Sequence, residues 1–415
     1  MKRLLLRALL IFCSFLSIDC SALNVWTKMR DFPGTARHDA SSFVIGHYGF
    51  VGGGSNGSNY YSDFYKWDQS TNTWSPIASY PGAGQYSMLC YAVNGKGYVG
   101  LGASSGDVSH TDWWSYDTIS NKWTAMTSFP GTARYDVTSF VIGHKIYVIG
   151  GSAGGPPYLN DCYVYDADAN TWKQLKNSPV ANIDLMAGFA IGKNGYICGG
   201  YDGSSVYNTF WKYDTLKDSW SSLPSFPLSA GITAKPGSFV FGSKGYICTG
   251  KSGTSVGSTI ALGYVYDTIT NAWSTFTNLG TTGIERCVAV TFSIGNDAYV
   301  ATGIDSLGNS LNDLWQSGIC PDNNIYEGIS DLHKSLLKIF PNPTSGQATI
   351  VFENEKNENL NVKIVNGIGR EMYSGFFSSS NLIVNLDLNS EKNGIYLVIV
   401  QGQSMSFVQR IMLMH

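Results

Sequence analysis

Tryptophan recurs along the first two thirds of this chain at an almost constant interval. The residues are Trp26, Trp74, Trp123, Trp172, Trp220 and Trp273. Successive gaps are 48 (74−26), 49 (123−74), 49 (172−123), 48 (220−172) and 53 (273−220) residues. A period near ~50 residues marks a repeat architecture in which each unit is one supersecondary element. The ladder therefore predicts a fold of stacked, similar units, and it carries no information about a ligand.

Each unit reads as four short strands. An apolar strand such as 139–142 precedes a Gly turn, and a second strand ends in a glycine pair, as at Gly150-Gly151. A polar loop follows, a third strand ends in an aromatic residue and Asp, as at Tyr165-Asp166, and the Trp strand closes the unit. Short strands joined by Gly, Asn and Asp turns are typical of all-β folds. One such sheet cannot bury both of its faces, so radial packing into a propeller is predicted.

The two ends of the repeat region complete one another. A sixth unit begins at Arg286 and stops at Leu314-Trp315 without a Trp strand of its own. Residues 24–29 form a Trp strand with no three strands before it. We therefore predict a six-bladed propeller over residues 23–318, in which the N-terminal strand closes the ring as the outer strand of the sixth blade.

The glycine pair, the aromatic-Asp and the Trp at this spacing resemble the kelch family of β-propellers. The second unit departs from the pattern with Gly100-Leu101-Gly102, and the fifth with Thr249-Gly250 and a longer loop. The resemblance covers roughly residues 24–318 and implies an all-β, six-bladed kelch propeller. Propellers bind their ligands at the mouth of the axial channel, so the site is expected there.

Residues 1–22 read as a signal peptide. Lys2, Arg3 and Arg7 precede an apolar run over 4–16, and small residues end at Ala22. The run is shorter than the ~20 residues that a membrane span needs, and the rest of the chain contains no stretch that could span, so no transmembrane segment is expected. A lipoprotein anchor at Cys20 is the alternative, but Asp19 before it fits poorly. The protein is expected to leave the cytoplasm.

The composition changes after a linker over 319–335. The motifs at 339–346 (Ile-Phe-Pro-Asn-Pro-Thr-Ser-Gly), 366–370 and 394–397 resemble the type A sorting domain of the type IX secretion system. That resemblance implies a Bacteroidetes-type Gram-negative bacterium, the secretion machinery as a partner, a secreted or outer-membrane-surface location, and removal of the tail. Five strand-like runs predict a small Ig-like β-sandwich in 336–415, at 348–352, 360–365, 382–388, 395–400 and 407–413. The alternative is an accessory, carbohydrate-binding sandwich.

Candidate ligand contacts come from one register, 13 residues before each aromatic of the second strand. The register holds Arg37, Gln85, Arg134, Ile183, Thr233 and Arg286. Arginine forks match carboxylates and phosphates, so an anionic ligand on one side of the channel is the sharper hypothesis, with Tyr135 and Asp184 as neighbours. The alternative is that these arginines pair with Asp39 or Asp136 and brace the channel.

The polar loops between the second and third strands form another candidate surface. Aromatic residues there are suited to stacking on sugar rings, and they are Tyr60, Tyr61, Trp113, Tyr158, Tyr201 and Tyr207.

The residue inventory excludes several classes of protein. Charged residues make up 14% of the chain and the net charge is −3, which gives no case for nucleic acid. The six cysteines after the signal peptide are scattered singly, so we expect buried thiols and no metal site or cofactor, although Cys287 with Cys320 could form a disulfide. Only His38 and His110 lie near plausible faces, which makes the copper chemistry of galactose oxidase improbable.

These observations favour a non-catalytic binding module for an extracellular glycan or protein. The alternative is a carbohydrate-active enzyme that resembles the six-bladed kelch N-acetylneuraminate epimerases and acts on an anionic sugar. Such an enzyme needs a general acid or base, and Glu285 beside Arg286 is the only glutamate between Leu23 and Gly318.

Overall fold

The computed structural model describes two compact units separately. The described residues are 26–228, 231–254, 258–260, 262–277, 285–318, 337–340, 344–353, 359–366, 371–377, 381–391, 394–401 and 406–413. The predicted signal peptide, the linker, Cys320 and the Gly367–Arg370 motif lie outside them. Strands are the only regular elements in the described part of the chain, which bears out the all-β prediction.

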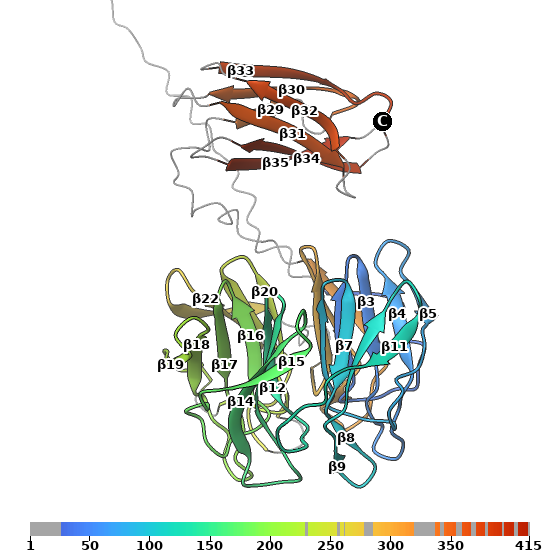
Figure 1. Ribbon diagram of the computed structural model, residues 1–415, viewed down its shortest axis with the longest axis vertical. Helices are drawn as coiled ribbons and strands as arrows, with labels where there is room; N and C mark the ends of the chain where they lie inside the picture. The colour runs from blue at the N-terminus through green and yellow to red at the C-terminus, as the bar shows by residue number, and fades with distance from the viewer. Residues whose placement is uncertain are drawn as a thin grey trace, which may run out of the picture. The chain divides into compact units, whose positions relative to one another are not determined.

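The repeat unit, residues 26–318, contains six four-stranded antiparallel sheets in its described part (Figure 1). The first three follow the chain, from the innermost strand outward. They are β2 (Ser41–Ile45), β3 (Tyr48–Gly52), β4 (Phe64–Asp68) and β5 (Thr73–Pro76); β6 (Leu89–Val93), β7 (Lys96–Gly100), β10 (Trp113–Asp117) and β11 (Lys122–Ala125); and β12 (Thr138–Ile142), β13 (Lys145–Gly151), β14 (Leu159–Asp166) and β15 (Thr171–Leu175).

The next two sheets repeat the same order. They are β16 (Ala187–Ile191), β17 (Asn194–Cys198), β18 (Phe210–Asp214) and β19 (Ser219–Ser222); and β20 (Gly237–Phe241), β21 (Lys244–Cys248), β22 (Leu262–Asp267) and β23 (Ala272–Thr277). Two short ribbons, β8 (Ala103–Ser104) with β9 (Val108–Ser109) and β24 (Arg286–Cys287) with β27 (Ile304–Asp305), form outside the six sheets.

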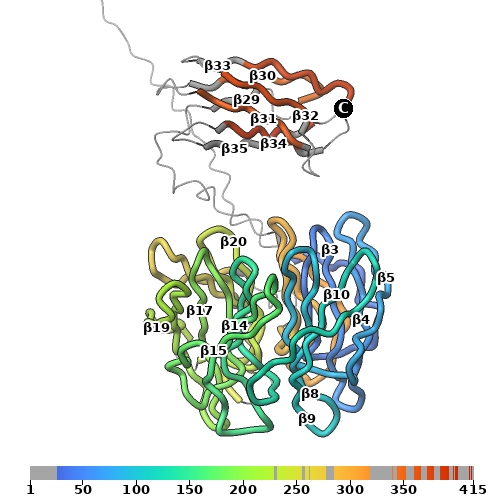
Figure 2. The backbone as a smooth tube through the Cα atoms, in the orientation of Figure 1, coloured from blue at the N-terminus to red at the C-terminus, as the bar shows by residue number. Residues whose placement is uncertain are grey.

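The sixth sheet joins the two ends of the repeat unit. It comprises β25 (Val290–Ile294), β26 (Asp297–Ala301), β28 (Leu314–Gly318) and, at its outer edge, β1 (Trp26–Lys28). Trp26 is opposite Ser317, and Lys28 is opposite Trp315. The start of the unit, in blue, and its end, in orange, lie side by side in Figure 2. The first described strand therefore supplies the strand that the last repeat lacks.

The tryptophan ladder joins neighbouring sheets. The indole N–H groups of Trp74, Trp123 and Trp172 donate to the carbonyls of Arg30, Ala78 and Thr127, each at 2.9 Å. Each carbonyl belongs to the segment that leaves the preceding Trp strand. The same indoles pack edge-on against an aromatic of that segment, as Trp172 does with Phe129 at 5.1 Å between ring centroids. The period thus reflects a contact that is repeated between sheets.

The aromatic-Asp dipeptide closes the turn between the third and fourth strands. Asp117 Oδ1 accepts the amides of Ile119 and Ser120, and Asp214 Oδ1 accepts those of Leu216 and Lys217. Asp side chains commonly accept turn amides in this way. The described cysteines, Cys90, Cys162, Cys198, Cys248 and Cys287, are buried as expected, and the alternative pairing of Cys287 with Cys320 stays a prediction because Cys320 lies outside the described residues.

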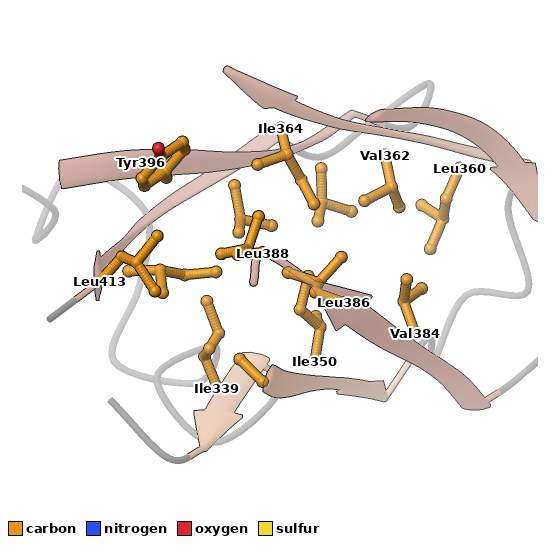
Figure 3. Close-up of a cluster of buried hydrophobic side chains, with 14 residues drawn as sticks. Ile339, Ile350, Leu360, Val362, Ile364, Val384, Leu386, Leu388, Tyr396 and Leu413 are labelled. Atoms are coloured by element: carbon orange, nitrogen blue, oxygen red, sulfur yellow. The ribbon is translucent and has the colours of Figure 1, made fainter. Parts of the chain in front are cut away.

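The C-terminal unit consists of two packed antiparallel sheets in its described part. One is β29 (Leu337–Phe340), β30 (Gln347–Glu353) and β33 (Asn381–Asp387); the other is β32 (Glu371–Phe377), β31 (Leu360–Asn366), β34 (Gly394–Gln401) and β35 (Ser406–Leu413). Figure 3 shows their shared core, with Ile350 and Leu386 facing Val362 and Ile364. The sequence analysis did not predict strands β29 and β32. The assignment of this unit as Ig-like stays a prediction. Among the described residues of the whole chain, no helix is long and apolar enough to cross a membrane.

Candidate functional site at the channel mouth

The arginine register lies where successive sheets meet. At four junctions a glycine that follows the second strand of one sheet donates its amide to the carbonyl of the register residue of the next sheet. The bonds are Gly54 N to Gln85 O at 2.8 Å, Gly102 N to Arg134 O at 3.0 Å, Gly250 N to Arg286 O at 2.8 Å and Gly303 N to Arg37 O at 2.9 Å. Gly54 has a φ of +90°, and an added Cβ would meet the His38 carbonyl at 2.7 Å, so this contact requires glycine.

The fifth sheet departs from the register. Gly200 N donates to Ile232 O at 2.7 Å, so Ile232 holds the place that the fixed spacing assigns to Thr233. Thr233 instead bridges to Lys251, as His38 bridges to Ser55 in the first sheet. The assignment of Thr233 is therefore wrong by one residue. The cause is local: Ala234 and Lys235 both adopt positive φ, at 61° and 49°, and accommodate one extra residue.

All three register arginines are locked inside the repeat unit. Their relative exposure is 0%, and each forms a bidentate pair with an Asp at the start of the third strand. Arg134 Nη1 and Nη2 lie 2.6 and 2.8 Å from Asp161, and Nη1 also donates to Gly150 O at 2.8 Å. Arg286 pairs with Asp313 in the same manner. We call these three contacts, Arg37–Asp63, Arg134–Asp161 and Arg286–Asp313, the arginine locks.

The locks show what the arginines do in the fold. The pairing carboxylates are Asp63, Asp161 and Asp313, rather than Asp39 and Asp136. Arg37 is also covered by rings, because its Cζ lies 4.9 Å from the centre of Phe32 and 4.0 Å from that of Tyr61. Burial raises the pKa of Asp313, but the hydrogen bonds and charge of Arg286 outweigh it and hold the net pKa below its usual value. A ligand would reach these guanidinium groups only if a lock opened.

The second sheet lacks a lock because Gln85 replaces the arginine. Asp112, at the position of Asp63, accepts the Tyr80 hydroxyl at 2.5 Å and has Gln85 Nε2 at 3.5 Å. Gln85 Oε1 and Asp112 Oδ1 are buried without a hydrogen-bond partner. Gln85 is 1% exposed, so this predicted ligand contact also lies beneath the surface.

Restoring the lock should stabilise the protein. In Tyr80→Phe/Gln85→Arg, phenylalanine matches Phe32 and Phe129 of the locked sheets, and the new guanidinium faces Asp112. Because Asp112 Oδ1 gains a charged donor and the unpaired Gln85 Oε1 is removed, we expect the free energy of unfolding to rise by about 1–3 kcal/mol, measured by urea denaturation. Tyr80→Phe alone should destabilise. A double variant no more stable than that single variant would contradict the account.

A ring of strained residues surrounds the entry of the innermost strands. Each residue precedes an innermost strand and has positive φ: Asp39 (51°), Ser87 (54°), Asp136 (55°), Leu185 (57°), Lys235 (49°) and Val288 (47°). Backbone hydrogen bonds link neighbouring sheets here, from Ser87 N to Asp39 O and from Asp39 N to Val288 O, both at 2.9 Å. We call this the mouth ring. The fold holds it in place even where a β-branched residue disfavours the conformation.

Relieving this strain at Val288 should stabilise the protein. Asparagine tolerates the left-handed region, whereas a β-branched residue is an outlier there. We expect Val288→Asn to raise the free energy of unfolding by about 1 kcal/mol. Val137→Asn is the matched control, because Val137 is a half-buried residue beside the ring with ordinary φ, and it should not gain stability. Equal responses of the two variants would show that strain at Val288 is unimportant.

Charged side chains of the mouth ring form a cluster. Lys235 Nζ lies 3.3 Å from Asp136 Oδ1, across sheets that are not neighbours. His38 Nδ1 is 2.8 Å from Asp39 Oδ2, and Ser87 Oγ donates to Asp39 Oδ1 at 3.1 Å. Burial raises the pKa of Asp39, but His38 and Lys235 outweigh it and lower the net value. The sequence analysis named Asp39 and Asp136 as partners of the arginines, and the structure places them instead with His38, Ser87 and Lys235, without the arginines.

The pKa values of the two other carboxyl groups, those of Asp136 and Asp184, shift upward instead. Burial, together with the charge of Asp39, raises the pKa of Asp136 despite Lys235. Burial and the charge of Asp136 raise the pKa of Asp184 well above its usual range. Asp184 is 2% exposed. Perturbed carboxyl groups gathered at an opening are characteristic of functional sites.

Half-buried tyrosines surround this cluster. Tyr86 lies 5.7 Å from Tyr60 and 5.6 Å from Tyr135 between ring centroids, with tilted planes. Burial is the main cause that raises the pKa of Tyr158. The charges of Asp184, Tyr201 and Tyr135 raise it further, so these groups lie near Tyr158. We call Tyr60, Tyr86, Tyr135, Tyr158 and Tyr201 the tyrosine rim. Three of them come from the loop aromatics that the sequence singled out, whereas Trp113 begins β10 and is buried in the core.

A cavity of about 230 Å³ lies below the mouth ring, between the innermost strands. Its lining includes Ser87 and Lys235 of the ring, with hydroxyls such as Ser41 and Ser238 that donate to carbonyls of neighbouring strands. Glu285 is half-buried beside β24 and does not line the cavity, and neither does a register arginine. Glu285 and Arg286 therefore do not belong to the lining of this cavity. No group of three or more potential metal ligands occurs in the described residues.

Comparison with known proteins identifies both units. The KLHDC2/KLHL20/DRC7 Kelch-repeats domain matches residues 125–303, the Kelch motif matches 36–79, and the Secretion system C-terminal sorting domain matches 338–414. A solved structure titled "Structure of YjhT" aligns with a TM-score of 0.56 at 15% identity, over 69% of this chain and 96% of that chain. That likeness shows the fold alone. No curated protein matches. The chain is a kelch-repeat β-propeller with a type IX sorting domain, which marks it for export to the cell surface or the medium.

Proposed function

We propose that the exported propeller binds a carbohydrate non-catalytically over the mouth of its channel. The tyrosine rim is the observation that carries this function. Tyr60, Tyr86 and Tyr135 follow one another from three successive sheets, with tilted ring planes, and Tyr86 and Tyr135 directly precede Ser87 and Asp136 of the mouth ring. Aromatic faces stack on the C–H faces of sugars, and nearby carboxylates accept sugar hydroxyls. The two together are typical of a sugar-binding surface.

The charge of the mouth favours an uncharged or cationic sugar over the anionic sugar that the sequence suggested. The three arginines that would hold an anion are neutralised in the arginine locks. At the mouth ring, Lys235 is accompanied by Asp39, Asp136 and Asp184. Lys235 already pairs with Asp136, and the carboxyl groups of the mouth can accept sugar hydroxyls but repel an anion when they are ionised. The arc of Arg37, Arg134 and Arg286 therefore supports the fold more directly than it supports a ligand.

A glycan array on the mature chain tests the proposed function. Tyr86→Ala and Tyr135→Ala should each weaken binding of the selected glycan by about tenfold, which corresponds to about 1.4 kcal/mol. Tyr48→Ala is the control, because Tyr48 is also half-buried but lies at the opposite end of its sheet from the mouth ring. Glycan binding that is lost equally in all three variants, or that persists in all three, would count against this surface.

A second candidate is acid–base catalysis on a bound sugar. The raised pKa values of Asp136 and Asp184 favour it, because burial favours the protonated form, in which a carboxyl group can donate a proton. The His38 imidazole is fixed nearby by its contact with Asp39. Interconversion of the anomers of N-acetylneuraminate, followed by proton NMR, tests this candidate. It predicts a rate above that of buffer which Asp136→Asn abolishes; a rate equal to buffer excludes it for this sugar.

A further inference from the structure

Asp184 is the least compensated charged group of the mouth. Its Oδ1 accepts the Leu185 amide at 2.7 Å, and no side-chain donor within the described part of the chain hydrogen-bonds to this carboxyl group. The residue is 2% exposed. The Lys235 ammonium nitrogen lies 3.3 Å from Asp136 Oδ1 instead. The Asp39 carboxylate is hydrogen-bonded to His38 and Ser87. Burial disfavours the ionised form of this carboxyl group, for which the Leu185 amide is a single donor, and an added cation would favour that form.

Aromatic faces adjoin this carboxyl group. Tyr135 and Asp184 hold equivalent positions in neighbouring sheets, where they bridge to Ser152 and Tyr201. The Tyr158 amide donates to Asn182 Oδ1 at 2.8 Å, two residues before Asp184. Tyr135 also faces Tyr86 at 5.6 Å with an interplanar angle of 59°. Tilted aromatic faces beside a carboxylate make up the usual recognition site for an ammonium group, which gains from the ring quadrupole and the charge together. A neutral hydroxyl would satisfy the carboxylate less completely.

We infer that the carbohydrate bound at the mouth carries a free primary amine, as in a glucosamine oligosaccharide, and that its ammonium group pairs with Asp184 between Tyr135 and Tyr158. This inference rests on the proposed function and narrows its ligand class. The sugar rings lie on the tyrosine rim, and the ammonium supplies the donor that Asp184 lacks. An N-acetylated sugar of the same length keeps the stacking but loses the charge, and a sialylated sugar adds the wrong charge.

Calorimetric titration of the full chain tests the inference with three probes: a glucosamine tetrasaccharide, its fully N-acetylated counterpart and sialyllactose. Near neutral pH, where the amine is still substantially protonated and the Asp184 carboxyl group ionises more readily than in acid, the glucosamine probe should bind at least about tenfold more tightly than the N-acetylated probe. Asp184→Asn should remove most of this preference and weaken binding of the glucosamine probe much more than binding of the N-acetylated probe. Asp214→Asn is the control, because Asp214 caps an exposed turn between β18 and β19 and should alter neither titration.

The outcomes separate this inference from the proposed function. Equal or tighter binding of the N-acetylated or sialylated probe by the wild-type chain overturns the amine inference and leaves carbohydrate binding intact. An equal loss for both glucosamine-based probes in Asp184→Asn also overturns it, because Asp184 would then support the site only structurally. If no probe binds and the glycan array is also negative, both proposals fail. The wild-type comparison needs no variant, so it decides even if Asp184→Asn does not fold.

Discussion

Replacing Arg134 by Ala is expected to lower the free energy of unfolding by about 3–5 kcal/mol, because the change leaves Asp161 without its partner inside the protein. Arg134 is 0% exposed, holds Asp161 through two hydrogen bonds and also donates to the carbonyls of Thr132 and Gly150. Its own carbonyl accepts Gly102 N of the preceding sheet. Loss of the side chain therefore affects three segments at once. Urea denaturation followed by tryptophan fluorescence measures the effect.

Two further variants separate the ion pair from the volume of the side chain. Arg134→Lys keeps the charge but not the bidentate fork, so an intermediate loss is expected. Arg134→Met/Asp161→Leu removes both charges and should recover most of the stability, since apolar replacements of a buried pair are often tolerated. A loss below about 1 kcal/mol for Arg134→Ala, as at an exposed salt bridge, would contradict a structural role for the lock.

Truncating Trp26 is expected to have an effect of similar size. Trp26→Ala should lower the free energy of unfolding by about 3–5 kcal/mol, the usual cost of removing a buried aromatic side chain. Trp26 is 4% exposed and packs with Phe239, Val265 and Val300. It also anchors β1, the strand that completes the sixth sheet. Thermal and urea unfolding of the full chain measure the loss.

Thr27→Ala is the control for Trp26→Ala, because Thr27 belongs to the same strand and is exposed. Its replacement should change the free energy of unfolding by no more than about 0.5 kcal/mol. If Trp26→Ala behaved like Thr27→Ala, β1 would contribute little to closing the ring.

Much of the fold could be predicted from the sequence, because the same strand and turn motifs recur in each repeat. The lone Trp26 and the incomplete sixth unit together indicate where β1 pairs. The lock partners also carried a signal that the sequence interpretation missed. Asp63 follows Arg37 by 26 residues, and Asp161 and Asp313 follow their arginines by 27. A carboxylate recurring at that offset from each arginine could have identified the locks.

The candidate site was less accessible to sequence reasoning. Lys235 meets Asp136 because ring closure brings non-neighbouring sheets together, and no local pattern records that contact. The extra residue at Ala234 and Lys235, which moves Ile232 into the register, is visible only in backbone conformation. Tyr135 and Asp184 were selected for their closeness to the arginines. In the structure Tyr135 is part of the tyrosine rim and Asp184 lies beside it. Their role as ligand contacts stays a prediction, which now depends on the rim and no longer on the arginines.

The central claim is that the tyrosine rim and mouth ring form a carbohydrate-binding surface. Titration of Tyr86→Ala/Tyr135→Ala beside the wild-type chain, with the best ligand from the glycan array, tests this claim most directly. We expect saturable binding to the wild-type chain, a loss of at least about 100-fold in the double variant from two contacts of about 1.4 kcal/mol each, and no change in Tyr48→Ala. Binding that survives the double variant with unchanged affinity would contradict the account and place the ligand elsewhere on the protein.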